Sequence, residues 1–213
     1  MTLREPRCNM LTANRVRLTP RDHGREVDPE EFEHSTGAEG YQYEIIDGRV
    51  YVTPLPDHPA ESLERWLFIK LFEYSQNHPD AIQYLSSKTR VFVPDRLKAT
   101  CPEPDIAAYD EYPHHLPRRE RRWQDISPML VVEVLSEAKP EKDLVRNVAL
   151  YVEVPSIKEY WIVDPRPDPD RPSLIAYRRR GKSWQKPIRV AYGEIYETPR
   201  LLPGFKLIVN PDA

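Results

Sequence analysis

Met129-Leu130-Val131-Val132-Glu133-Val134-Leu135 is an almost unbroken apolar run that decides the fold. Apolar runs of this length are typical of strands buried on both faces of a sheet. Glu133 is the single charge within the run. A carboxylate in a buried strand loses its hydration and needs a compensating cation or a set of donors. Its position is therefore the first indication of a site.

Regular elements are expected on both sides of this strand. Alternation around Asp47-Gly48, a dipeptide suited to a tight turn, predicts a hairpin over residues 41–53. Helical spacing of apolar residues predicts amphipathic helices over residues 59–76, with Asp57 as N-cap, and 140–152. β-branched and aromatic runs predict further strands at residues 88–93, 105–109, 159–163, 173–177 and 205–209.

These elements predict an α/β fold in which a mixed β-sheet is flanked by helices and carries extra β-hairpins. Residues 1–37 lack a sustained apolar period and are expected to form an irregular lead-in, with a short helix around residues 29–32. Residues 38–213 are then expected to form one domain. Residues 110–128 are rich in arginine and interrupted by proline, and they predict a loop between strands.

The overall composition excludes several classes of protein. The 213 residues carry 31 Lys and Arg against 34 Asp and Glu, a formal charge of −3, so no basic field covers the whole protein. The two cysteines, Cys8 and Cys101, are far apart and form neither a disulfide framework nor a zinc motif. No signal peptide and no run of roughly 20 apolar residues is present, so we expect a soluble, cytoplasmic protein.

Asp105 and Glu133 carry the chemistry that the sequence predicts. Asp105 opens one predicted strand and Glu133 lies within the next, so adjacent strands would bring the two carboxylates together. Such a pair repels itself unless a cation lies between its members. Hard oxygen ligands suit Mg²⁺ or Mn²⁺, which lower the pKa of bound water and support phosphodiester hydrolysis. Glu44 and His58 are further candidates for the same cleft.

Five motifs together resemble the Uma-two family of putative restriction endonucleases, within the PD-(D/E)xK nuclease superfamily. The resemblance covers roughly residues 27–209, and each motif is weak alone. In order, the motifs are Tyr43-Glu44-Ile45-Ile46-Asp47-Gly48, Glu103-Pro104-Asp105-Ile106, Val132-Glu133-Val134-Leu135-Ser136, Tyr160-Trp161-Ile162-Val163-Asp164-Pro165 and Leu202-Pro203-Gly204-Phe205.

The resemblance implies a restriction-endonuclease-like fold and a role for each candidate. Asp105 is similar to the aspartate of the PD motif and Glu133 to the acidic residue of (D/E)xK, which hold a divalent metal. Glu44 is similar to an additional acidic metal ligand of the family, and His58 to its frequent histidine. The superfamily also uses a lysine, which supplies positive charge to the transition state.

The expected lysine is absent from its usual positions. Leu135 stands two residues after Glu133, and Asn147 stands where many relatives carry a lysine on the following helix. An amide donates hydrogen bonds but supplies no positive charge. Lys142 is the leading substitute, ahead of Lys139 and Arg146. In an ordinary α-helix, however, five residues separate Lys142 from Asn147 and turn the two side chains in different directions.

Each candidate also has a structural interpretation. Glu133 can be a buried charge satisfied by an arginine or a helix N-terminus, and Asp105 a strand-entry residue. Glu44 can be a solubilising residue of a hairpin arm, and His58 a helix cap. The runs at 118–122 and 178–182 suit phosphate contacts beside an acidic site, but solvated loop charge is the commoner explanation.

Two functions follow from these residues. The first is a Mg²⁺- or Mn²⁺-dependent endonuclease acting on DNA as a homodimer, with Asp105, Glu133 and Glu44 as metal ligands and Lys142 as the charge stabiliser. The second is a catalytically weakened nuclease fold that serves as a nucleic-acid or protein interaction module. A Lys or Arg nitrogen in front of Asp105 and Glu133 would favour the enzyme.

Overall fold

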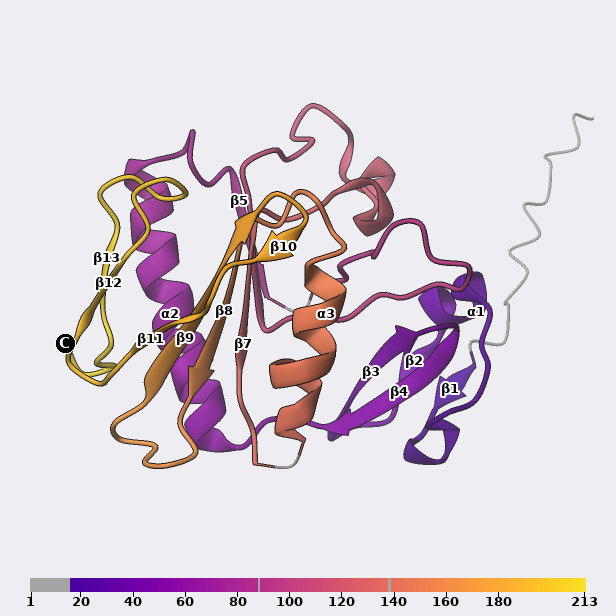
Figure 1. Cartoon of the computed structure of the whole chain (residues 1–213). Coiled ribbons are helices and arrows are strands. Elements are labelled where there is room, and N and C mark those ends of the chain that lie inside the picture. Colours follow the sequence, from indigo (N-terminus) through magenta and orange to yellow (C-terminus); the bar gives the residue numbers. More distant parts are fainter. Residues whose placement is uncertain (1–15, 88, 138) are drawn as a thin grey trace, which may run out of the picture.

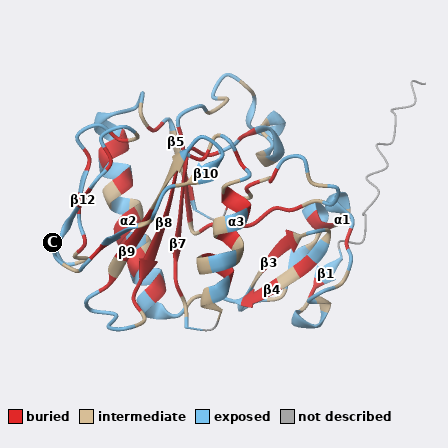
Figure 2. Ribbon diagram, viewed as in Figure 1, coloured by how far each residue is buried: buried red, intermediate tan, exposed pale blue. Residues whose placement is uncertain are grey.

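The computed structural model describes residues 16–87, 89–137 and 139–213, so Cys8 lies outside the described residues. A central sheet runs through the molecule, with one long helix on one face and a shorter helical segment on the other (Figure 1). Strands and helix faces that meet in the middle are buried, whereas most connecting loops are exposed (Figure 2). No helix among the described residues is long and apolar enough to cross a membrane.

The central sheet is mixed, as the sequence predicted. β7 and β8 are parallel, and the other neighbouring strands are antiparallel. In spatial order its strands are β10 (Ser183–Trp184), β9 (Ser173–Arg180), β8 (Glu159–Asp164), β7 (Leu130–Val134), β6 (Ile106–Tyr109) and β5 (Tyr84–Ser87), and β11 (Ile188–Val190) pairs with β9. Ile106 lies opposite Val132 in the register, which places Asp105 beside Glu133 at one edge.

The two faces of the sheet bury different helices. Leu130, Val132 and Val134 of β7 pack in the cluster that contains α2 (His58–Asn77), whose N-cap Asp57 accepts from the amide of Ala60. The hairpin of β12 (Ile195–Glu197) and β13 (Lys206–Ile208) contributes Tyr196 and Leu207 to this cluster.

The alternate residues of β7, whose side chains point to the other face of the sheet, face the second helical segment. Val131 and Leu135 join Leu150 and Tyr151 in a separate core cluster. The segment consists of a π-helical turn, η4 (Lys142–Arg146), and the short helix α3 (Asn147–Tyr151). Side chains alternate along a strand, so Glu133 points to this same face.

The predicted hairpin is present beside this second layer. β3 (Tyr41–Ile46) and β4 (Arg49–Pro54) are joined by Asp47 and Gly48, whose φ angles of 48° and 72° are those of a tight primed turn. Residues 16–37 are more ordered than an irregular lead-in. They form β1 (Arg17–Leu18), η1 (Pro20–Asp22), α1 (Pro29–His34) and β2 (Thr36–Gly37).

Three apolar side chains explain the order in this N-terminal segment. Leu18, Val27 and Phe32 are buried in one cluster with Ile45 and Val50 of the hairpin. Isolated apolar residues in a polar stretch carry no period, so their shared core was not visible in the sequence. The domain boundary at residue 37 stays a prediction.

One predicted strand was misplaced. The strand expected at residues 88–93 is replaced by β5, which comes earlier, and Lys88 lies outside the described residues. The amides of Val91 and Val93 donate to the carbonyls of Pro102 and Thr100 without forming a strand. Residues 110–128 form the expected loop, which contains the 3₁₀ turns η2 (Arg118–Glu120) and η3 (Trp123–Asp125).

Candidate catalytic site

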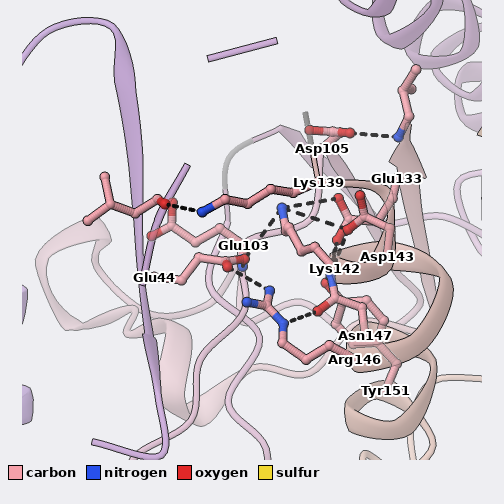
Figure 3. Close-up of polar contacts among 12 residues, drawn as sticks. Glu44, Glu103, Asp105, Glu133, Lys139, Lys142, Asp143, Arg146, Asn147 and Tyr151 are labelled. Carbon is pink, nitrogen blue, oxygen red and sulfur yellow. Dashed lines mark hydrogen bonds and ion pairs between the residues drawn. The ribbon is translucent and has the colours of Figure 1, made fainter. Parts of the chain in front are cut away.

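A small cavity lies where β7 ends and β6 begins, between the hairpin and the π-helical turn. Its volume is about 30 Å³, enough for a water molecule or a cation of similar size. Figure 3 shows that acidic and basic side chains from β3, β7 and the helical segment converge in this region. The cavity lining includes Thr53, Asp105, Glu133, Ser136, Lys139, Lys142 and Asp143.

Glu133 is held at the centre of this arrangement. Its side chain is 1% exposed, and its Oε1 accepts hydrogen bonds from Asn147 Nδ2 at 2.8 Å and Tyr151 Oη at 2.9 Å. Its Oε2 lies 4.0 Å from Lys142 Nζ. Burial, together with the neighbouring carboxylates, raises the pKa of Glu133 to about 8, although Lys142 opposes the shift.

Asp105 lies beside Glu133, as the register requires. Its Oδ2 accepts from the main-chain amide of Val134 at 2.7 Å, which fixes the carboxylate against the end of β7. Desolvation raises the pKa of Asp105 to about 7, and the charge of Lys142 and the Val134 amide oppose this shift. Two carboxylates with raised pKa values are groups that a bound cation would ionise.

Lys142 reaches into the site, contrary to the direction expected from an α-helix. The amide of Asn147 donates to the carbonyl of Lys142, five residues earlier, which is the bond of a π-helical turn. This wider turn places both side chains on the same face, and both approach Glu133. Lys142 is 9% exposed, and its pKa is raised because the surrounding carboxylates outweigh its burial.

Asp143 is a site residue that the sequence reasoning missed. It is 6% exposed, and its Oδ1 accepts from Asn147 Nδ2 at 2.9 Å and lies 3.8 Å from Lys142 Nζ. Burial and the charge of Glu133 raise the pKa of Asp143 well above its ordinary value. Acidic residues in the first turn of a helix are common, so the sequence alone did not distinguish Asp143 from a surface charge.

Glu44 lies behind the cavity and holds two of the cations. It is 1% exposed, its Oε2 lies 2.6 Å from Arg146 Nη2, and its Oε1 lies 3.6 Å from Lys142 Nζ. The amide of Glu103 also donates to Oε1. Burial disfavours ionisation of Glu44, but Lys142 and Arg146 outweigh it, so its pKa is lowered.

Arg146 links Glu44 to the amide of Asn147. Its Nε donates to Asn147 Oδ1 at 2.9 Å, so the Asn147 amide group is oriented with its nitrogen toward Glu133. The guanidinium also lies 4.5 Å from the centre of the Tyr51 ring, a cation–π distance. Arg146 therefore fixes the orientation of the Asn147 amide, which donates to Glu133.

The two remaining candidates, Lys139 and His58, differ in whether they line the cavity. Lys139 lines the cavity, donates to the carbonyl of Val52 at 3.1 Å and lies 4.9 Å from the Tyr51 ring centre. His58 is the first residue of α2, where it is exposed and is not part of the cavity lining. The structure brings Asp105, Glu133, Glu44 and Lys142 together and leaves His58 outside.

The two basic runs lie at the other end of the sheet. Residues 118–122 belong to the loop that leads into the start of β7, whereas the carboxylates lie at its end. Arg178 of the second run pairs in register with Glu159 at the start of β8, which is parallel to β7 (Figure 1). The topology therefore separates both basic runs from the acidic site, so the alternative in which they contact phosphate beside that site is not supported.

The carboxylates that line the cavity match the ligand type of a divalent cation, but they are not already arranged around one. Asp105, Glu133 and Asp143 supply hard carboxylate oxygens to one cavity, the ligand type that Mg²⁺ and Mn²⁺ prefer. Within the described ranges, no three acidic, histidine or cysteine side chains are already spaced around a metal-sized point. Lys142 Nζ instead lies within 4.0 Å of Glu44, Glu133 and Asp143, where its charge partly replaces that of a metal.

Comparisons with known proteins agree with this architecture. The model of the Uma2 family, described as "Putative restriction endonuclease", matches residues 29–210. A crystal structure of a putative nuclease belonging to DUF820 from Anabaena variabilis superposes with a TM-score of 0.62 at 15% identity, covering 84% of this chain and 93% of that chain. At this identity the likeness shows the fold. No curated protein matches the sequence.

Proposed function

The chain belongs to the Uma2 family of putative restriction endonucleases, and from this premise we propose that it is a metal-dependent endonuclease acting on DNA phosphodiester bonds. The family supports a nuclease-like function in general. Metal dependence, DNA as the substrate and hydrolysis as the reaction belong to the proposal. A homodimer and a cytoplasmic location stay predictions.

The observation that carries the proposal is the position of Lys142. Its ammonium lines the same cavity as Asp105 and Glu133. A nuclease site needs a positive charge beside its acidic groups to stabilise the charge that develops on the phosphoryl oxygens. The π-helical turn supplies this charge although Leu135 and Asn147 occupy the positions where the family resemblance implies a lysine. This arrangement favours the enzyme over an interaction module.

Each residue then has a chemical role. Asp105 and Glu133 would hold the divalent cation, which when bound polarises the phosphoryl group and lowers the pKa of a water. Lys142 directs positive charge toward the cavity. Asn147 and Tyr151 hold Glu133 in one orientation by donating to its Oε1.

We assign Glu44 a supporting role in place of the metal-ligand role predicted from the sequence. Its two oxygens face Arg146, Lys142 and the amide of Glu103, and it is not part of the cavity lining. Asp143 lines the cavity and is the better third carboxylate. His58 is exposed at the start of α2 and has no role in this proposal.

The test is plasmid nicking with Mg²⁺ or Mn²⁺ by the native chain and by Asp105→Asn and Glu133→Gln. We expect each variant to lose activity by about 10³-fold or more, because each removes a charged metal ligand. Glu73→Gln, an exposed glutamate of α2, is the matched control and should cut like the native chain. Equal nicking by all four proteins would overturn the proposal.

Two further measurements separate metal binding, catalysis and substrate. Calorimetric titration with Mn²⁺ should show binding to the native chain and weakened binding to Glu133→Gln. Single- and double-stranded DNA and RNA of the same sequence identify the substrate. Nucleic-acid binding without cleavage at saturating Mn²⁺ would favour the interaction module.

A further inference from the structure

A second and larger cavity lies at the end of the sheet opposite the carboxylates. Its volume is about 580 Å³, within the usual range of small-molecule sites. It is built from the loop before β8, the end of β9 and the turn after β12, a region near the β9–β10 connection in Figure 1. The side chains that define its chemistry are Lys158, Arg178, Arg179, Gln185, Thr198 and Arg200.

The lining of this cavity is strongly cationic in a protein whose formal charge is −3. Its described lining residues carry four positive side chains, from Lys158, Arg178, Arg179 and Arg200, and one negative side chain, from Glu159. A local excess of positive charge of this size attracts anions. The net charge of this cavity is therefore positive, unlike that of the carboxylate site.

The single carboxylate is already satisfied by protein donors. Glu159 is 4% exposed, and its oxygens accept from Trp161 Nε1, Tyr196 Oη and Thr198 Oγ1. Arg178 Nε lies 3.2 Å from its Oε1. Glu159 thus neutralises part of the charge of Arg178 and leaves the other three cations without a carboxylate in this cavity.

Arg179 contributes charge but no donors, because its guanidinium is fully engaged by the main chain. It donates to the carbonyls of Tyr151, Val152, Val154, Ile157 and Gly181. Desolvation without a carboxylate partner lowers its pKa. A bound anion would supply the counter-charge that the protein does not.

Lys158 and Arg200 are available to contact such an anion. Both are exposed, and across the described parts of the chain neither forms an ion pair. The ammonium of Lys158 makes one long contact of 3.4 Å to the carbonyl of Pro155. Gln185 adds an exposed amide to the same wall.

We propose that this cavity binds a small phosphate-bearing ligand, held by Lys158 and Arg200 over the charge of Arg178 and Arg179. A nucleic-acid strand offers the same phosphate chemistry but fits less well. Lys158 also lines a neighbouring cavity of about 610 Å³, whose other lining residues include Asp110, Glu111 and Asp125. These carboxylates would repel a polyanion that continued beyond the cationic cavity.

The test is calorimetric titration of the full chain with pyrophosphate, with ADP and with a single-stranded DNA oligonucleotide, all without divalent metal. We expect pyrophosphate and ADP to bind, and the Lys158→Gln/Arg200→Gln double variant to bind each about tenfold or more weakly. Lys186→Gln with Lys182→Gln, which removes two exposed charges outside the cavity, should change affinity less than about twofold. Glu133→Gln should bind like the native chain, which separates this cavity from the proposed catalytic site.

Three outcomes would overturn the proposal. One is no heat of binding with pyrophosphate or ADP. Another is equal affinity in the native chain and the cavity double variant, provided that both unfold at the same temperature. The third is binding of the oligonucleotide alone, which would assign the cavity to a nucleic-acid backbone.

Discussion

Two buried glutamates on neighbouring parallel strands have opposite surroundings. Glu159 lies at the start of β8 and Glu133 near the end of β7, so the two occupy opposite ends of one strand pair. They are 4% and 1% exposed. Burial alone therefore does not distinguish them.

Their partners make the difference. Glu159 accepts from three neutral donors and pairs with a single arginine, Arg178, with no other carboxylate among these contacts. Glu133 shares one ammonium, that of Lys142, with Glu44 and Asp143. A carboxylate that accepts hydrogen bonds from surrounding donors stabilises the fold. A cluster in which carboxylates outnumber cations instead favours the binding of a cationic ligand.

Among the changes that test this contrast, removing the shared cation has the largest expected effect. Lys142→Gln should lower the nicking rate by about 10²- to 10³-fold, the usual loss when one preorganised charge or donor is removed. Its affinity for Mn²⁺ should be equal or tighter, because the ammonium competes with a metal for the same carboxylates. Nicking assays and Mn²⁺ titration of one protein preparation measure both quantities.

Lys139→Gln is the matched control for this variant, since Lys139 lines the same cavity but donates to the carbonyl of Val52. We expect it to retain more activity than Lys142→Gln. A Lys142→Gln protein that cuts at the native rate would show that the charge needed for catalysis comes from elsewhere.

Of the two glutamates, the sequence identified Glu133 as a candidate but not Glu159. The apolar run around Glu133 predicted both a buried strand and a site, and the pairing with Asp105 followed from adjacent strands. Glu159 opens an equally apolar strand but gave no signal of its own. Its donors Tyr196 and Thr198 come from a distant hairpin, and sequence distance conceals such contacts.

The direction of Lys142 was beyond prediction for a different reason. Apolar periodicity assumes 3.6 residues per turn, and nothing in the residues 140–152 marks one wider turn. The buried polar residues Lys142, Asp143 and Asn147 form that turn and satisfy one another only once Glu133 faces them. Tertiary contacts therefore decide the local geometry.

The second prediction concerns pH. Asp105 and Glu133 have folded-state pKa values raised to about 7 and about 8, so the stability they confer is present below their unfolded values and is lost as pH rises through the folded values. The metal-free protein should therefore lose several kcal/mol of unfolding free energy, on the order of 5–7 kcal/mol, between about pH 5 and 8. Urea denaturation across this range measures the slope.

Mg²⁺ should oppose this loss, and its stabilising effect should be larger at pH 8 than at pH 6, because it binds the ionised carboxylates. The Asp105→Asn/Glu133→Gln variant should show a flatter pH dependence without metal. Glu44, whose pKa is lowered, contributes in the acidic range and should not alter this slope. An unchanged slope in the double variant would contradict the assignment.

The third prediction compares two variants, in each of which one of the two glutamates is replaced by glutamine. Glu159→Gln should cost roughly 2–3 kcal/mol of unfolding free energy, because Arg178 loses its counter-charge and a charged acceptor is removed from three donors. Glu133→Gln should cost less or stabilise the metal-free protein above pH 8, where it removes a repelled charge. Urea denaturation of both variants at pH 8.5 compares them, and a larger loss for Glu133→Gln would reverse the contrast.

The smallest effect separates the two tyrosines that donate to these glutamates. Tyr151 Oη donates to Glu133, and Tyr196 Oη donates to Glu159. Each Tyr→Phe change should cost about 1–2 kcal/mol of unfolding free energy, because it leaves a buried carboxyl oxygen with one donor fewer. Only Tyr151→Phe should also change Mn²⁺ affinity, because it frees the Glu133 carboxylate to turn. If Tyr196→Phe altered Mn²⁺ affinity as strongly, the two ends of the strand pair would be coupled and the separation between structural and functional carboxylates would fail.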